Sequence, residues 1–255
     1  MNVLVTGGTG ALGRDVVTAL RARGHRAVVL SRRAGEGADW RQGDLATGAG
    51  IAAAVAGQDA VVHAGSATVQ PWKYRSTDVD GTRRLLQLAV EAGVKHVVYV
   101  SIVGMEGVAY PYYRYKLAAE AEMRQDVLPW SILRATQFHT LLELFLGLMS
   151  KLPGLMTVPY SWQFQPVDTA DVAARLVEAV EDGPGGLLPD FGGPEVSDFR
   201  SIAESWRRAR RLRRRLVNLP LPFKASRQFA AGRLLCPEHA DGKVTWEQYL
   251  ARKYG

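Results

Sequence analysis

The sequence has a single cysteine, Cys236, and no long apolar run. One cysteine excludes an intramolecular disulfide and is typical of a reducing compartment. The most apolar stretch, residues 141–149, is far too short to span a bilayer and contains Glu143. The N-terminus also lacks the basic region and apolar core of a secretory signal peptide. These absences predict a cytoplasmic protein without membrane insertion.

Metal-ligand spacing and nucleic-acid motifs are absent as well. His63 and His139 are isolated, and no potential ligands are spaced around the cysteine, so we expect no metal site.

The net charge is +7, and seven arginines fall within residues 207–215. A basic run of this kind can bind nucleic acid or an anionic membrane surface. No aromatic residue interrupts it and no nucleic-acid motif surrounds it, so we interpret it as a solvated helix and strand edge.

Short apolar runs alternate with helical patterns over the first two-thirds of the 255 residues. This alternation predicts an α/β fold, a doubly wound parallel sheet of the Rossmann type. Residues 1–150 are predicted to form this core. Residues 151–255, where prolines become frequent, are predicted to form a small substrate lobe that interleaves with the core as one folding unit. The predicted strands are 2–6, 26–31, 60–63, 96–101 and 131–134, and the predicted core helices are 11–23, 51–55, 80–92 and 113–125.

A glycine-rich turn follows the first predicted strand directly. Gly7, Gly10 and Gly13 are spaced three residues apart, and a helical pattern begins at residue 11. A turn of this kind lets the backbone approach a pyrophosphate, and the following helix offers unpaired N–H groups and a partial positive charge. We therefore predict a dinucleotide site at this turn, which also contains Thr9 and Leu12.

The second predicted strand ends without an acidic residue. A carboxylate at this position bonds the ribose of NAD, whereas arginine accommodates the additional phosphate of NADP. Ser31, Arg32 and Arg33 stand there instead. Because guanidinium groups match phosphate in geometry and charge, these residues predict NADP (NADPH) as the cofactor.

The chain resembles the short-chain dehydrogenase/reductase superfamily, within it the atypical NmrA-like group of NAD(P)-binding proteins. The glycine turn carries the first part of the resemblance. The remaining family-like segments extend to about residue 195 and include Gly43-Asp44-Leu45, His63-Ala64-Gly65, Val100-Ser101, Tyr112-x-x-x-Lys116 and Ile132-Leu133-Arg134.

The resemblance implies roles for two of these segments in cofactor binding. Asp44 and Leu45 are expected to lie against the adenine. Ala64 and Gly65 are expected to pass close to the cofactor phosphates and ribose.

The resemblance also implies a set of catalytic residues. Tyr112 would pass a proton to or from the reacting oxygen, and Lys116 would lower the pKa of Tyr112 and hold the nicotinamide ribose. The four-residue spacing places both on one helix face. Ser101 would orient the substrate carbonyl, but Ile102 follows it where many relatives have a second serine, so the catalytic set is either shifted or incomplete.

Three residues are candidates for substrate contacts. Phe138 and His139 follow the segment expected near the nicotinamide, and His139 is an equally good candidate for a cap of the helix 140–150. Trp162 belongs to a methionine and aromatic group that either lines an apolar pocket or forms part of the core.

These observations favour an NADP-dependent oxidoreductase that transfers hydride to or from a carbonyl or quinone-like small molecule. The alternative is a non-catalytic NADP(H)-sensing regulator that acts through a protein partner, as found among NmrA-like relatives. An epimerase or dehydratase of nucleotide sugars is less favoured because the C-terminal lobe is small. Substrate identity, oligomeric state and the role of the basic run stay open.

Overall fold

The chain divides into two compact units, both discontinuous in sequence. The computed structural model describes residues 1–125 and 127–255. The boundary expected near residue 150 does not coincide with a limit of either unit. The first unit comprises Met1–Ser101, Pro111–Arg134 and Val172–Pro189, and the second comprises Ile102–Tyr110, Ala135–Asp171 and Asp190–Gly255.

The described part of the first unit is built on a seven-stranded sheet in the order β3-β2-β1-β4-β5-β6-β9. The neighbours whose register the structure defines run parallel. The predicted Rossmann-type doubly wound fold is confirmed. The strands are β1 (Asn2–Thr6), β2 (Arg26–Ser31), β3 (Trp40–Gln42), β4 (Ala60–His63), β5 (His96–Ile102), β6 (Trp130–Ala135) and β9 (Gly186–Leu187).

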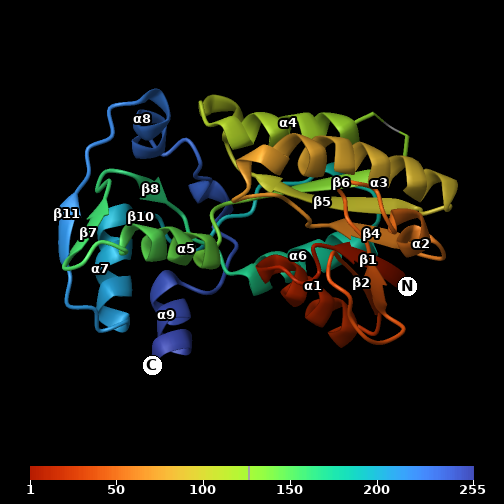
Figure 1. The fold of residues 1–255 in the computed structure, drawn as a ribbon, viewed down its shortest axis with the longest axis horizontal. Helices are drawn as coiled ribbons and strands as arrows, with labels where there is room; N and C mark the ends of the chain where they lie inside the picture. The colour runs from red at the N-terminus through yellow and green to blue at the C-terminus, as the bar shows by residue number, and fades with distance from the viewer. Residues whose placement is uncertain (126) are drawn as a thin grey trace. The chain divides into compact units, whose positions relative to one another are not determined.

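Helices cover both faces of this sheet. Figure 1 shows α3 and α4 on one face, and α1 and α6 on the other. Alternate residues of a strand point to opposite faces of the sheet. Leu4 of β1 points to the α3 side, where it belongs to the same buried cluster as Leu85 of α3. The helices of this unit are α1 (Ala11–Ala22), α2 (Ile51–Val55), α3 (Asp80–Glu91), α4 (Pro111–Met123) and α6 (Thr169–Asp182), with a short 3₁₀ turn at Pro71–Lys73 and a π-helix at Tyr74–Val79 before α3.

The second unit has its own core of large side chains. Trp206 and Phe199 of α7 pack with Leu142 of α5 and Trp246 of α9. Strands β7 and β11 pair in parallel, and β8 and β10 pair antiparallel. Its elements are α5 (His139–Met149), β7 (Leu155–Val158), β8 (Gln163–Phe164), β10 (Ser197–Asp198), α7 (Phe199–Ala209), β11 (Arg215–Asn218), α8 (Lys224–Ala230) and α9 (Trp246–Tyr254), with 3₁₀ turns at Met105–Gly107 and Pro237–His239.

Helix length and polarity bear on membrane crossing. Within residues 1–125 and 127–255, every helix is too short or too polar to cross a bilayer.

Candidate cofactor pocket and active site

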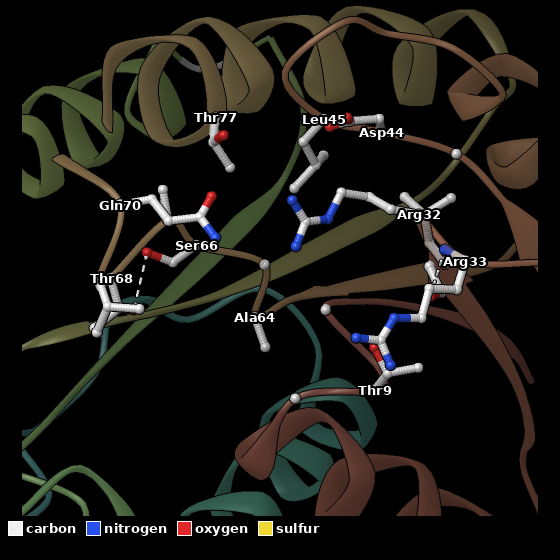
Figure 2. A pocket seen from close by; sticks show the side chains of 18 residues that line it. Thr9, Arg32, Arg33, Asp44, Leu45, Ala64, Ser66, Thr68, Gln70 and Thr77 are labelled. Atoms are coloured by element: carbon white, nitrogen blue, oxygen red, sulfur yellow. Dashed lines mark hydrogen bonds between the residues drawn. The ribbon is translucent and has the colours of Figure 1, made fainter. Parts of the chain in front are cut away.

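A pocket opens in the first unit at the carboxyl ends of β1, β2 and β4. The strand order reverses between β1 and β4, and this switch point is where doubly wound sheets bind ligands. Figure 2 shows the side chains that line the pocket. They are Gly7, Thr9, Gly10, Leu30, Ser31, Arg32, Arg33, Gly43, Asp44, Leu45, Ala64, Gly65, Ser66, Ala67, Thr68, Val69, Gln70 and Thr77.

The glycine turn touches the turn that follows β4. Gly7 has a φ of +67°, and a Cβ built on it would lie 2.8 Å from the carbonyl oxygen of Ala64 and the Cα of Gly65. A Cβ on Gly13 would lie 2.1 Å from the carbonyl oxygen of Gly7. Only glycine therefore allows helix α1 to begin this close to the turn. Leu12 is 6% exposed, and neither it nor Gly13 lines the pocket.

A buried hydrogen-bond chain holds these two turns together. The backbone N–H of Gly65 donates to Thr6 Oγ1 (3.0 Å), which also bonds His63 Nδ1 (2.7 Å). On the other side of the ring, His63 Nε2 bonds Thr82 Oγ1 (2.9 Å). Thr82 donates its own proton to the carbonyl oxygen of Asp78 (2.5 Å), so it accepts from His63. His63 therefore carries a proton on Nε2, and because its pKa lies well below neutral its Nδ1 is unprotonated and accepts from Thr6.

Burial lowers the pKa of His63 to about 3, so we expect this tautomer to persist well below neutral pH. The unfolded chain takes up a proton at His63 as the pH falls below about 6.5, whereas the folded protein does not. This residue therefore removes stability as the pH falls from about 6.5 toward 3. Long-range ¹H–¹⁵N spectra at pH 5 should show a neutral Nε2–H imidazole, and a protonated ring would contradict the assignment.

The end of β2 presents two arginines to the pocket. The backbone N–H of Arg33 donates to Ser31 Oγ (3.2 Å), which fixes the turn that follows the strand. Figure 2 shows the guanidinium groups of Arg32 and Arg33 reaching into the pocket. Among the residues that the structure describes, neither forms an ion pair with a carboxylate. The carboxylate of Asp44 accepts from the N–H of Ala46 (2.9 Å) and thereby shapes its own loop.

These features fit a dinucleotide. The glycine turn lines the pocket with the bare backbone of Gly7 and Gly10, and Gly10, the N-cap of α1, has no capping side chain. Helix α1 therefore presents backbone N–H groups and the positive end of its dipole at the turn. Arg32 and Arg33 add two positive charges beside it.

Tyr112, in the first turn of α4, connects to the pocket through Ser66. Its hydroxyl lies 2.6 Å from Ser66 Oγ, and Ser66 donates its proton to Asp78 Oδ1 (2.5 Å). Tyr112 is therefore the donor to Ser66, in a chain that runs from Tyr112 through Ser66 to Asp78. Because Tyr112 is only 6% exposed, burial raises its pKa, and the nearby Asp78 carboxylate raises it further. Tyr112 is a neutral phenol at physiological pH.

Lys116 is buried one helical turn after Tyr112 but does not contact the Tyr112 hydroxyl. Its ammonium donates to the hydroxyl of Tyr99 (2.5 Å) and the carbonyl oxygen of Val100 (2.9 Å), both on β5. Burial lowers the pKa of Lys116 to about 8. Neither of these contacts involves the Tyr112 hydroxyl, so the expectation that Lys116 lowers the pKa of Tyr112 stays a prediction. The four-residue spacing sets a common helix face, but the lysine reaches inward to the strand.

Ser101, at the end of β5, is also committed to another contact. Its hydroxyl bonds Glu120 of α4 and helps to lower the pKa of that carboxyl group, although burial opposes this shift. Glu120 also receives two hydrogen bonds from Arg134, at 2.9 and 2.7 Å. Ser101 therefore belongs to a buried ion-pair cluster that ties α4 to β5 and β6.

The sequence analysis missed several residues of this pocket. Ser66, Thr68, Gln70 and Thr77 line it, and Asp78 anchors Ser66. The available signal was position, because a loop that directly follows Ala64 and Gly65 must pass over the same end of the sheet. The contact between Ser66 and Tyr112 has no signal in the sequence, because 46 residues separate them.

The predicted substrate contacts lie in the second unit. His139 is 1% exposed, packs against the rings of both Trp246 and Tyr249, and has its Nδ1 3.7 Å from an oxygen of Asp168. These contacts of His139 are those of a core residue. Phe138 is partly buried in a bridge to Val167, and Trp162 stacks on Phe199 and Phe229 and donates to Ser226 Oγ (2.8 Å).

Solved structures of other proteins share this fold. A short-chain dehydrogenase/reductase superfamily protein from Agrobacterium tumefaciens with bound NAD has a TM-score of 0.72 at 22% identity, covering 99% of this chain and 95% of that one. An NADPH-dependent quinone oxidoreductase from Escherichia coli complexed with NADPH has a TM-score of 0.77 at 14% identity, covering 99% and 100%. At these identities the likeness shows the fold alone.

Sequence similarity identifies the family. A photosystem II assembly factor, Ycf39 of Trieres chinensis, is 29% identical over 199 residues, which cover 71% of this chain. The chain spans only 60% of the length of that relative. A family model described as NAD(P)H-binding matches residues 7–182. The chain belongs to the NAD(P)H-binding family, which confirms the predicted resemblance to NAD(P)-binding proteins.

Proposed function

We propose that this protein is an NADP-dependent oxidoreductase that transfers hydride between nicotinamide and a carbonyl or quinone-like small molecule. One observation carries the proposal: the hydroxyl of Tyr112 lies one hydrogen bond from Ser66, which lines the pocket beside the glycine turn. A phosphate-binding turn and a proton donor thus belong to the same continuous site.

Tyr112 is the proposed acid of the reaction. Its raised pKa keeps it protonated, so it can donate to the oxygen of a carbonyl that is being reduced. Once the phenol has given up its proton, the hydroxyl of Ser66 can turn to donate to the phenolate, and the phenol regains its proton from solvent. A bound nicotinamide cofactor supplies or accepts the hydride.

Arg32 and Arg33 are the proposed basis of NADP preference. Hydrogen bonds to a charged partner contribute about 1.5–3 kcal/mol each, which corresponds to roughly 10- to 150-fold in affinity. The preference therefore depends on whether these guanidinium groups bond the phosphate of the adenosine ribose.

Arg32→Asp combined with Arg33→Asp is expected to lower the ratio of NADPH to NADH affinity by at least about 30-fold. Isothermal titration with each nucleotide measures this ratio. Lys95→Asp is the matched control, because Lys95 is exposed and lies outside the pocket. An unchanged ratio in the double variant would remove both arginines from the proposed role.

A non-catalytic NADP(H) sensor is the second candidate, and one observation favours it. Two of the three predicted catalytic side chains are engaged elsewhere: Lys116 with Tyr99 and Val100, and Ser101 with Glu120. NADPH oxidation measured over a panel of carbonyls and quinones separates the candidates. Turnover supports the oxidoreductase, whereas tight NADPH binding without turnover across the panel supports the sensor.

A further inference from the structure

The positive charge of the protein is concentrated in two segments of the second unit. Residues 144–167 and 205–237 hold eleven of the 32 lysines and arginines and none of the 25 acidic residues. The remainder of the chain therefore carries a net charge of −4, although the whole carries +7. In the part of the chain that the structure describes, the arginines of residues 207–215 form no ion pair with a carboxylate. The charges of the exposed Arg208, Arg211, Arg213 and Arg215 are available to a partner.

The two segments lie directly against each other. The guanidinium of Arg214 donates to the carbonyl oxygen of Leu152, and the N–H of Arg215 donates to that of Gly154 (2.9 Å). From there β11 runs parallel to β7, with Arg215 opposite Leu155 and Val217 opposite Thr157. Figure 1 shows β7 and β11 side by side, next to α7. The end of the basic run is therefore part of a small sheet.

The two faces of this sheet differ: the β7 residues of one face are buried, and the other face carries exposed apolar side chains beside Arg215. Met156 and Val158 of β7 are completely buried in the core of the unit. The opposite face presents Leu155 and, two and four residues after Arg215, Val217 and Leu219. The exposed aliphatic and aromatic side chains of residues 152–155 and 208–223 are Leu152 (57% exposed), Phe223 (48%), Leu155 (41%), Leu219 (37%) and Val217 (36%).

We propose that this surface, residues 152–155 and 208–223, docks the protein on an anionic lipid membrane. Arginines at a rim of exposed leucine, valine and phenylalanine match an interface where phosphates lie directly above hydrocarbon. The arginines pair with lipid phosphates while the aliphatic side chains enter the acyl boundary. Duplex nucleic acid offers the phosphates but no apolar layer, so it leaves the exposed leucines in water. This surface shares no residue with the lining of the cofactor pocket.

Co-sedimentation with vesicles tests this docking. We expect the protein to bind vesicles of phosphatidylcholine with 30 mol% phosphatidylglycerol, and to bind pure phosphatidylcholine at least about 10-fold more weakly. Each arginine near an anionic surface contributes a factor of about five to partitioning. Arg208→Glu, Arg213→Glu and Arg215→Glu combined should therefore reduce binding by at least about 100-fold. The matched control changes Lys95, Arg114 and Lys243 to glutamate; these residues are exposed, outside the two segments, and without ion pairs among the described residues.

The aliphatic side chains separate a membrane from other polyanions. Leu152→Gln combined with Leu155→Gln keeps every charge and should weaken binding to the anionic vesicles by at least about 10-fold, with little effect on binding to a 30-base-pair DNA duplex. Three results would overturn the proposal. The first is equal binding to vesicles with and without phosphatidylglycerol. The second is a loss of vesicle binding in the control variant as large as in the arginine variant. The third is vesicle binding that the leucine changes leave intact while DNA competes with vesicles for the protein.

Discussion

Tyr112→Phe is expected to lower kcat for NADPH oxidation by at least about 100-fold while changing the affinity for NADPH by less than about threefold. General acids commonly contribute 10²- to 10⁴-fold to a rate, and phenylalanine has no proton to donate. Affinity should persist because Tyr112 is not among the residues that line the cofactor pocket, and the substitution removes only its hydroxyl. Stopped-flow absorbance at 340 nm with the best substrate of the panel measures both quantities.

Tyr115→Phe is the matched control. It removes a hydroxyl from the same helix, and its ring contacts Tyr74, as does that of Tyr112. If the Tyr115 variant keeps full activity, then removal of a hydroxyl from α4 does not by itself impair catalysis. Full activity of the Tyr112 variant would remove Tyr112 from the chemistry.

Gly13→Ala is expected to destabilise the protein by roughly 3 kcal/mol or more and to weaken NADPH binding by at least about 100-fold. The added Cβ would lie 2.1 Å from the carbonyl oxygen of Gly7 and 2.7 Å from the Cα of Gly8. Both neighbours are backbone, so either α1 or the glycine turn has to move. Since the turn is the proposed phosphate site, stability and affinity should fall together in urea unfolding and NADPH titration.

Gly147→Ala makes the same chemical change in another helix. A Cβ on Gly147 of α5 would meet no atom within 4 Å, so alanine there should be neutral or stabilise the protein by up to about 1 kcal/mol. Comparable losses in the two variants would contradict a specific packing role for Gly13.

Local sequence patterns were sufficient for the Rossmann core. The five predicted strands coincide with β1, β2, β4, β5 and β6 within one residue at either end, because buried parallel strands are continuous apolar runs. Strands β3 and β9 were not predicted. They have only three and two residues, and their existence depends on pairing with a neighbour rather than on their own composition.

The functional site also has a part that the sequence predicts and a part that it does not. The backbone parts of the pocket were predictable, since glycines and the ends of strands determine where a chain can approach a phosphate. The contacts of the predicted catalytic side chains were not, because Lys116 and Ser101 took buried partners on β5 and α4. A spacing of four residues defines a helix face but does not determine which neighbour a long side chain reaches.

The transfer of deuterium from [4-²H]NADPH to an acceptor tests the proposed function most directly. Both 4-position isotopologues are incubated with the carbonyl and quinone panel, and the products are analysed by mass spectrometry for wild type and Tyr112→Phe. The account predicts deuterium in a reduced product from one isotopologue, with the yield lowered at least about 100-fold by the substitution. Tight NADPH binding without label in any product, or label transfer that is indifferent to Tyr112, would contradict it.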